Sequence, residues 1–365
     1  MQTIDLSEFE APKTLLFLLA SKYLGNLLIG LDLVKAASVQ LAQQGHTPVG
    51  LFDASYQPLV EAAGLPKVMR CIYYPRRSMK QGKFWSRISI MTNFLRELRQ
   101  IKADIVLDID GDNVHGNFAR LSGAQLRVGN RFSHKKNRFN KIIQNQDEAE
   151  TRWENYWRVI EWLPIQKPNQ SYARLQFSTA IKQQIDHVFE RYGIDNTQPI
   201  VAIHPSANKA YKQWPVANFT QLTQSLSQQG CQVVLVGAGK LDKEKVDVIL
   251  ENAHAPVIDL CNRLSLPQLY TLYTRCALII GNDTGPSHLA ASTGRPCIAI
   301  FGPTNEKFWG PMGKNVTILK GPTPCESHCL RSRCVSTSPY HCLSSLTANA
   351  VILQSETVLN SKLVR

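Results

Sequence analysis

The sequence predicts an α/β protein made of two doubly wound domains, each built on a parallel β-sheet. Apolar runs of strand length alternate with longer helical stretches, a pattern typical of βαβ units. The alternation occurs twice, and a segment rich in Pro, Asn and Gln, from about Glu161 to Ala180, separates the two series. A chain of 365 residues is long for one core and sufficient for two domains. We expect these domains at residues 1–165 and 166–365.

The first half begins with an apolar strand at Thr14–Ala20, followed by the glycine-containing loop "SKYLGN" and a helix through "LDLVKAASVQLAQQG". A second strand is expected at "PVGLFD". The run Ala103–Asp112, "ADIVLDIDGD", predicts a strand that ends in acidic residues. A helix at "NVHGNFARLSG", closed by Gly123, and a strand at "QLRVGN" follow.

The second half repeats this order of elements. The strand "PIVAIH" is followed by a helix at "WPVANFTQLTQSLSQQG" that ends at Gly230. A strand at "CQVVLVGAG" runs into a glycine turn, and a helix is expected at "SLPQLYTLYTRC". Two apolar runs, Cys276–Ile280 and Cys297–Phe301, then flank a helix of about two turns that ends at Gly294.

The short helix between those two runs begins in the stretch "GNDTGPSH". Asp283 or Thr284 can cap its first turn, and Pro286 suits a position where an N–H would be unpaired. The N-terminus of such a helix attracts phosphate, Gly285 allows close approach to the backbone, and His288 can reach the same anion. The alternative is an ordinary capped helix with a histidine on the surface.

The formal net charge of +13 calls for an acidic partner or another reason. Basic residues gather in Lys67–Arg99 and Arg127–Lys141, where they could hold nucleic acid, an anionic membrane surface or a phosphorylated glycolipid. A solvated surface that only aids solubility is the alternative. Nucleic acid is disfavoured because no recognition motif accompanies the clusters, which lie in the first half while the phosphate features lie in the second. The expected acceptor-binding residues are Arg76, Arg77, Lys80, Lys83, Lys135 and Lys136.

Four of the nine cysteines are bunched near the end of the chain, with gaps of three, four and seven residues. The gaps are not those of a zinc ribbon, although His328 and His341 could complete a metal site, so metal, packing and a loop staple all stay open. The bunched cysteines are Cys325, Cys329, Cys334 and Cys342. The apolar run near the start follows acidic residues and is interrupted by Lys22 and Asn26, so we expect a cytoplasmic protein without a signal peptide or membrane span.

The second half resembles glycosyltransferase family 9, the bacterial heptosyltransferases of lipopolysaccharide core assembly. The resemblance rests on "KQWP", "VVLVGAG" and "GNDTGPSHLAASTGRPCIAIFGPT", between about Val201 and Gly313. The first half resembles the family more loosely, through "ADIVLDIDGD" and "RLSGAQLRVG", and the cysteine-rich segment 325–342 also resembles one seen in many members.

This resemblance implies a GT-B fold, in which two Rossmann-like domains face a central cleft, with acceptor bound by the first and donor by the second. It implies inverting transfer of a heptose, or a related sugar, from an ADP-sugar to the lipopolysaccharide or lipooligosaccharide core. No metal and no other cofactor is expected. Contact with the inner face of the inner membrane is expected, and nucleic acid is not an expected partner.

The resemblance also implies roles for donor-site residues. Lys212 would neutralise the donor diphosphate, Ser206 would hydrogen-bond it, and the Thr284–Pro286 turn would present backbone N–H groups to it. Asp283 would accept hydrogen bonds from sugar hydroxyls, and Leu264 would pack on the adenine. The full set expected at the donor is Ser206, Lys212, Leu264, Asp283, Thr284, Gly285, Pro286 and His288.

One departure from the family concerns the catalytic base. The family carries an aspartate in the first glycine loop, whereas this chain has Asn26, and an amide cannot act as a general base. Asp110 or Asp112, or with less support His115, could take that role, although the two aspartates could equally be helix caps. Otherwise the chain is a slow or acceptor-specialised transferase, or it binds a nucleotide sugar without turnover.

Overall fold

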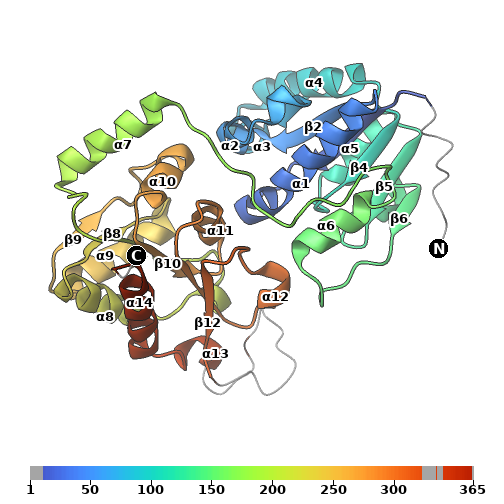
Figure 1. The fold of residues 1–365 in the computed structure, drawn as a ribbon. Helices are drawn as coiled ribbons and strands as arrows, with labels where there is room; N and C mark the ends of the chain where they lie inside the picture. Colours follow the sequence, from blue (N-terminus) through green and yellow to red (C-terminus); the bar gives the residue numbers. More distant parts are fainter. Residues whose placement is uncertain (1–10, 323–333, 335–339, 364–365) are drawn as a thin grey trace. The chain divides into compact units, whose positions relative to one another are not determined.

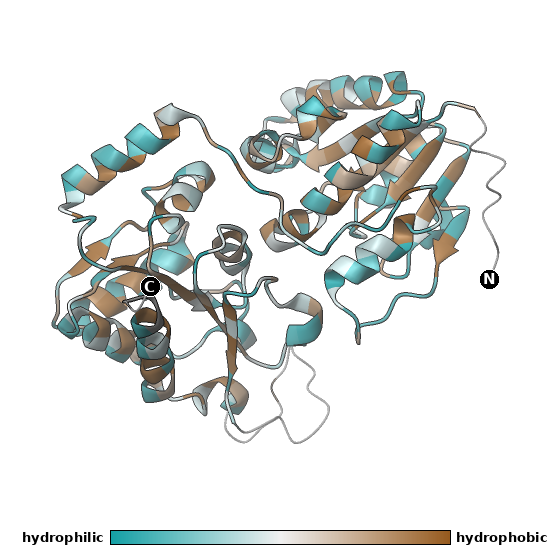
Figure 2. Cartoon of the chain, in the orientation of Figure 1, coloured by the Kyte–Doolittle hydropathy of each residue, from teal (hydrophilic) through white to brown (hydrophobic). Residues whose placement is uncertain are grey.

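The computed structural model describes residues 11–322, 334 and 340–363. The chain divides into two compact units, residues 1–176 (unit 1) and 177–365 (unit 2). In both units a six-stranded parallel sheet carries helices on its two faces (Figure 1). Apolar residues are concentrated on the strands and the inward faces of the helices (Figure 2).

Unit 1 has the sheet order β3-β2-β1-β4-β5-β6. Its strands are β1 (Thr14–Leu19), β2 (Thr47–Asp53), β3 (Arg70–Tyr74), β4 (Ile105–Asp108), β5 (Leu126–Asn130) and β6 (Lys141–Ile143). Its helices are α1 (Leu24–Gln43), α2 (Gln57–Ala62), α3 (Arg76–Gln81), α4 (Phe84–Gln100), α5 (His115–Leu121) and α6 (Arg152–Ile160).

Unit 2 has the sheet order β12-β11-β10-β7-β8-β9, which is the same winding of its own six strands. The strands are β7 (Ile200–His204), β8 (Gln232–Leu235), β9 (Val257–Asp259), β10 (Leu278–Asn282), β11 (Cys297–Phe301) and β12 (Val316–Lys320). The helices are α7 (Thr179–Tyr192), α8 (Val216–Gln228), α9 (Lys240–Asn252), α10 (Leu266–Tyr273), α11 (Gly285–Ser292), α12 (Glu306–Trp309), α13 (His341–Ser344) and α14 (Ala348–Leu363).

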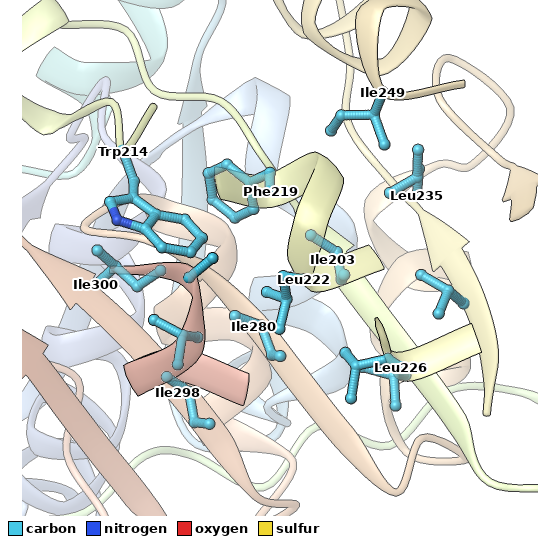
Figure 3. Packing of buried hydrophobic residues seen from close by; sticks show 14 of the residues in the cluster. Ile203, Trp214, Phe219, Leu222, Leu226, Leu235, Ile249, Ile280, Ile298 and Ile300 are labelled. Atoms are coloured by element: carbon cyan, nitrogen blue, oxygen red, sulfur yellow. The ribbon is translucent and has the colours of Figure 1, made fainter. Parts of the chain in front are cut away.

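The inner strands are buried on both faces, as the continuous apolar runs in the sequence predict. In unit 1, α4 and α5 cover one face through Phe94, Leu98 and Phe118, which pack with residues of β1 to β4. In unit 2, α8 and α14 pack on the sheet around Trp214 and Phe219, whose rings meet edge to face with centroids 4.8 Å apart (Figure 3).

The segment between the two series of elements lies along unit 1. The side-chain amides of Gln40 in α1 and of Gln44, which directly follows α1, donate to the carbonyls of Gln166 and Pro164. The N–H of Gln176 donates to the carbonyl of Ala62. The division between the units therefore falls after Gln176, later than the position expected from the run of prolines.

Helix α1 is long and apolar enough to cross a membrane by length and composition, but 72% of its apolar stretch is buried inside unit 1. Gly30 of this helix lies against β1, since a Cβ there would come within 2.9 Å of the Leu19 side chain. We interpret α1 as a core helix of an α/β unit.

Candidate active site

In both units several of the candidate residues follow the two central strands of the sheet. The strand order reverses between β1 and β4 in unit 1 and between β7 and β10 in unit 2. Doubly wound sheets bind their ligands at this reversal, beyond the carboxyl ends of the strands. In unit 1, Asn26 follows β1, and residues 109–112, which we call the acidic turn, follow β4. In unit 2, Ser206 and Lys212 follow β7 and Asp283 follows β10.

Asn282, the last residue of β10, fixes the loop that carries Lys212. Its side-chain Nδ2 donates to the carbonyl of Ser206 at 3.3 Å, and its Oδ1 accepts from the N–H of Trp214 at 3.1 Å. Trp214 is buried and donates its indole N–H to the carbonyl of Leu346. Both ends of the loop are therefore tied down, a role of Asn282 that the sequence interpretation missed although the residue stands inside "GNDTGPSH".

Lys212 and Asp283 form an ion pair, with Nζ 2.7 Å from Oδ2. The side chain of Asp283 is almost fully buried, whereas that of Lys212 is 23% exposed. From the sequence we expected Lys212 at the diphosphate of the donor and Asp283 at its sugar. In the structure the two side chains are in direct contact. A diphosphate at this position would compete with Asp283 for the ammonium group.

Thr284 is the N-cap of α11, but its side chain makes no capping hydrogen bond in the described part of the chain. Of the two predicted capping residues, Thr284 is the one at the N-cap position, but the side-chain capping hydrogen bond expected of it is not made within the described residues. The open N–H groups at this end remain available to an anion. Pro286 has no N–H, so the expected donors reduce to Thr284 and Gly285. The predicted helix end is confirmed, because Gly294 has a φ of +75° directly after the last helical turn.

His288 is buried within α11, not on the surface. Burial and the nearby charge of Lys212 lower the pKa of His288 to about 4, against a hydrogen bond with the backbone of Trp309 that acts in the opposite direction. The ring is therefore neutral near pH 7. It can donate or accept a hydrogen bond beside the α11 N-terminus, but it adds no positive charge there.

Replacing His288 with Asn should weaken the pH dependence of stability in the acidic range. Because the folded pKa of about 4 lies below the ordinary value of 6.5, the unfolded chain takes up this proton first as the pH falls. The free energy of unfolding should drop by about 1.4 kcal/mol per pH unit between these values, and the variant should lack that contribution. Thermal unfolding from pH 7 to 4.5 measures it. His187→Asn is the control because His187 is exposed on α7, and equal slopes in both variants would contradict the assignment.

His204 and Asp242 form a further polar pair that the sequence interpretation did not single out. His204 ends β7, and its Nε2 lies 3.2 Å from Oδ2 of Asp242, which also accepts the N–H of Ala238. Burial would raise the pKa of Asp242, but these contacts lower it below its ordinary value. Ser206, two residues after His204, is fully buried beside this pair, so its hydroxyl is less open to a ligand than the sequence suggested.

Leu264 lies in the loop after β9 and is partly buried. The edge strand β9 is separated from β10 by β7 and β8, which corresponds to roughly 14 Å at a strand spacing of about 4.8 Å. Leu264 thus follows a strand that is not next to the one that Asp283 follows. A ligand of nucleotide length would be needed to reach both residues.

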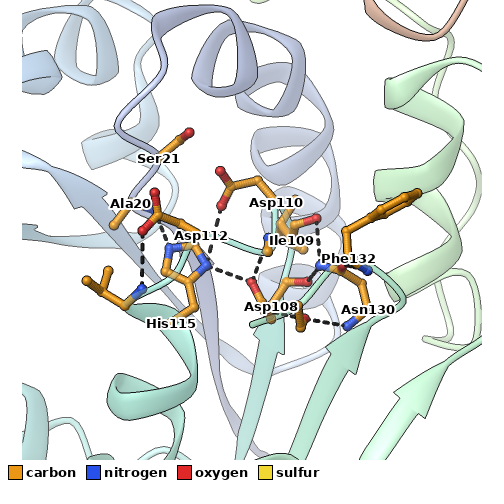
Figure 4. Close-up of polar contacts among 12 residues, drawn as sticks. Ala20, Ser21, Asp108, Ile109, Asp110, Asp112, His115, Asn130 and Phe132 are labelled. Carbon is orange, nitrogen blue, oxygen red and sulfur yellow. Dashed lines mark hydrogen bonds and ion pairs between the residues drawn. The ribbon is translucent and has the colours of Figure 1, made fainter. Parts of the chain in front are cut away.

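In unit 1 the acidic turn after β4 is held by a buried network (Figure 4). His115 Nδ1 lies 2.6 Å from Oδ1 of Asp108, and its Nε2 accepts the N–H of Ala20 at 3.1 Å. Asp108 also accepts the hydroxyl of Ser133 and the N–H of Gly111. Since both ring nitrogens of His115 are engaged inside the unit, we interpret this residue as one that positions the turn, not as a base.

Asp110 and Asp112 have different surroundings. Asp110 is buried and its Oδ1 is 3.3 Å from His115 Nδ1. Burial raises the pKa of Asp110, opposed by His115 and reinforced by the charge of Asp108. Burial would also raise the pKa of Asp112, but the nearby His115 ring and the guanidinium of Arg76, 3.1 Å away, together lower it below the ordinary value. Asp112 also accepts the backbone N–H of Lys22 at 3.3 Å, which ties the turn to the loop before Asn26. The carboxylate of Asp110 is therefore the more basic of the two.

Arg76 differs from the other five residues expected at the acceptor. Its guanidinium is largely buried and binds Asp53 at 2.6 Å, Asp112 at 3.1 Å and the carbonyl of Ala20 at 2.6 Å. These contacts join the ends of β1, β2 and β4, so Arg76 stabilises the turn and is not open to a ligand. The remaining five are exposed on two segments of unit 1: Arg77, Lys80, Lys83, Lys135 and Lys136.

Two groups of residues contain side chains that can bind a metal ion. The ligand atoms of Asp108, Asp110 and His115 lie within 4.8 Å of one another. The 2.6 Å contact between His115 and Asp108 is a hydrogen bond, however, and it occupies the nitrogen that a metal would need. Of the cysteine-rich segment 325–342, Cys325, Cys329 and His328 lie outside the described residues, so the metal hypothesis for it stays a prediction.

Residues 91–339 match the sequence profile of "Glycosyltransferase family 9 (heptosyltransferase)". Lipopolysaccharide heptosyltransferase 3 of Escherichia coli is 25% identical over 246 residues, which are 65% of this chain and 70% of that protein. Lipooligosaccharide heptosyltransferase 2 of Haemophilus influenzae is 27% identical over 163 residues, 43% of this chain and less than half, 46%, of the relative.

Solved structures with the same fold cover nearly the whole chain. A glycosyl transferase family 9 protein from Veillonella parvula has a TM-score of 0.80 at 23% identity, covering 96% of this chain and 99% of that one. The ADP-heptose lps heptosyltransferase II of E. coli has a TM-score of 0.71 at 20% identity, with coverage of 96% and 99%. E. coli heptosyltransferase WaaC with ADP has a TM-score of 0.69 at 21% identity, covering 94% and 99%. The predicted fold class, α/β of the GT-B kind with two doubly wound domains, is confirmed.

Proposed function

The chain belongs to glycosyltransferase family 9, and from this premise we propose that it moves a heptose, or a related sugar, from an ADP-sugar to the core of lipopolysaccharide or lipooligosaccharide. That the chain is a glycosyltransferase follows from the family. The choice of sugar and acceptor is supported by the names of the relatives, which are lipopolysaccharide and lipooligosaccharide heptosyltransferases. The choice of ADP is supported by the two E. coli structures, whose names include it.

The observation that carries the donor assignment is the position of Lys212 in unit 2. Its ammonium lies 2.7 Å from Asp283, the residue just before the uncapped N-terminus of α11. A full positive charge and the positive end of a helix thus act at one place. In an inverting transfer the negative charge grows on the departing diphosphate, and fixed positive groups stabilise it without a metal ion.

For the acceptor we propose Asp110 as the general base. It would take the proton of the acceptor hydroxyl, whose oxygen then attacks the anomeric carbon from the side opposite the diphosphate, so that the configuration inverts. Its raised pKa suits this task, while Asp112 is neutralised by Arg76. Asn26, which is partly exposed in the first turn of α1, would bind a hydroxyl without removing its proton.

The five exposed basic residues of unit 1 fit an acceptor that carries phosphate or acidic sugars. Arg77, Lys80 and Lys83 come from one segment, and Lys135 and Lys136 from the loop after β5. Cation contacts at such exposed positions are individually weak, so several are needed to hold an anionic glycolipid. Action on the cytoplasmic side of the inner membrane stays part of this proposal.

The direct test is a product assay. Purified protein is mixed with ADP-heptose and a truncated, deacylated core oligosaccharide, and the products are identified by mass spectrometry. A mass gain of one heptose together with ADP release supports the proposal, and transfer from a different nucleotide sugar corrects the donor. No transfer from any of the nucleotide sugars tried would contradict it.

A second candidate function is nucleotide-sugar binding without turnover. The observation in its favour is Asn26, which stands where the family has its aspartate. Calorimetric titration with ADP-heptose separates the two readings when it is combined with the product assay. Binding of the donor without any product would favour the second.

Transfer is expected to survive treatment with EDTA. The reason is that Lys212 and the α11 N-terminus supply the positive charge that magnesium or manganese supplies in metal-dependent transferases. The measurement compares initial rates before and after chelation, with dialysed protein as the control. A rate that is abolished by EDTA and restored by either ion would show that the charge balance at the donor is different.

A further inference from the structure

The first turns of α4 expose three large apolar side chains next to one another. Phe84 is 65% exposed, Trp85 78% and Ile88 45%. All seven residues from Lys83 to Ser89 are exposed. The rings of Phe84 and Trp85 contact each other, with centroids 5.4 Å apart. We call these three residues the α4 tip; an exposed apolar cluster of this size marks a contact with something outside the unit.

The α4 tip contributes little to the core of unit 1. Further along the same helix, Phe94 and Leu98 are buried, and Phe94 packs against Tyr74 and Phe118 with centroids about 5 Å apart. The helix is therefore anchored by its second half, while its first turns project with their apolar side chains in solvent. Phe84 and Trp85 therefore bury little apolar surface against unit 1 and add little to its stability.

The chain around the α4 tip is strongly basic. Between Glu61 and Glu97 the sequence has eight Lys or Arg residues and no acidic residue. Those nearest the tip in sequence are exposed: Arg77, Lys80, Lys83 and Arg87. An aromatic and aliphatic tip surrounded by cations matches the interface of an anionic bilayer, where apolar side chains enter the headgroup region and Lys and Arg meet lipid phosphates.

The α4 tip also lies on the edge of the sheet where the acidic turn is found. Helix α3 starts at Arg76, directly after β3, and Arg76 binds Asp112 and Asp53 at this carboxyl edge. Helix α4 follows α3 after only two residues, so it too starts at that edge and runs back along the sheet. A surface bound to the tip would therefore be on the same side of unit 1 as Asp110.

We propose that the α4 tip is a membrane anchor, which docks unit 1 on a bilayer containing anionic lipids so that the acidic turn faces a glycolipid held in that bilayer. The docking itself rests on exposure and charge alone. Only the purpose, delivery of a lipid-linked acceptor, rests on the proposed function.

The test measures partitioning of the full chain onto vesicles of phosphatidylcholine with about one-third phosphatidylglycerol, by sedimentation. The triple variant Phe84→Ser, Trp85→Ser, Ile88→Ser should bind at least about tenfold less, since apolar side chains lose their transfer from water. Leu353→Ser is the matched control, because Leu353 is 66% exposed on α14 of unit 2. Lys80→Gln and Lys83→Gln should each weaken binding roughly fivefold, and Lys240→Gln, 93% exposed on α9, should not.

Insertion of the tip is read from Trp85 itself. Brominated lipids should quench part of the tryptophan fluorescence of the parent, and Trp85→Phe should lose that part while it still binds. The proposal is overturned if the triple variant binds vesicles as strongly as the parent, or if the parent does not bind them. It is also overturned if the tip variants instead abolish self-association in sedimentation velocity or binding to a homopolymeric RNA.

Failure of the anchor and failure of the proposed function give different results. Transfer to the soluble, deacylated acceptor should be unchanged in the triple variant, because the tip does not touch the reacting groups. Loss of vesicle binding by the parent with soluble transfer intact would refute the anchor alone. Vesicle binding without transfer to any acceptor would refute the proposed function alone.

Discussion

Asp110→Asn is expected to lower the rate of transfer by about 10²–10⁴-fold, the range typical of general-base catalysis. The amide that replaces the carboxylate has nearly the same shape but cannot take a proton. Asp110 is the acid whose pKa burial raises, and its Oδ1 contacts His115 Nδ1 at 3.3 Å, a contact that an amide oxygen can also make. The fold should therefore tolerate the change, and single-turnover rates at saturating donor measure the loss.

Two further variants decide whether Asp110 acts as the base. Asp112→Asn should cost less in rate and more in stability, because it leaves the largely buried Arg76 with one acidic partner fewer. Asn26→Asp restores the family residue; a large gain in rate would mean that the chain is a weakened transferase. An unchanged rate in Asp110→Asn, together with a gain in Asn26→Asp, would move the base away from the acidic turn.

Lys212→Ala is expected to weaken donor binding and to slow transfer roughly ten- to a hundredfold, because a charge-assisted contact contributes about 1.5–3 kcal/mol. Calorimetry with ADP measures the affinity. Lys209→Ala is the control, since Lys209 is exposed in the same loop. An affinity for ADP equal to that of the parent would show that the diphosphate binds elsewhere.

The ion pair with Asp283 complicates this variant in a predictable way. Removing Lys212 leaves a buried carboxylate without its partner, which destabilises unit 2 in addition to the donor site. The double variant Lys212→Ala, Asp283→Asn removes both charges and should recover much of the lost stability. Donor affinity should stay low in the double variant, because the positive charge is still missing.

The sequence alone was sufficient for the fold class and for the inner strands of both sheets. Its apolar runs predict β1, β2, β4 and β5 in unit 1 and β7, β8, β10 and β11 in unit 2. The strands that it did not predict are the four edge strands: β3, β6, β9 and β12. Edge strands have one open side and are only partly buried, as in β6 and β9, so they need no continuous apolar run and give no signal.

Local motifs also predicted those features of the site that depend only on residues close together in the sequence. The stretch "GNDTGPSH" predicts a strand end, a short helix and an open helix N-terminus, because each depends on residues a few positions apart. The same local chemistry allowed Asp110, Asp112 and His115 as bases, since all three follow β4 within seven residues. Nothing within that segment separates them.

Only the tertiary structure separated these residues, because burial and charge pairing depend on segments far apart in the chain. Arg76, at the start of α3, pairs with Asp112 in the turn after β4, while burial raises the pKa of Asp110. The Lys212–Asp283 pair joins loops from two different strands. The exposure of Trp85 follows from where α4 leaves the core. The sequence thus determined which side chains are present at each strand end, and the packing within each unit decided which of them are charged, paired or open to a ligand.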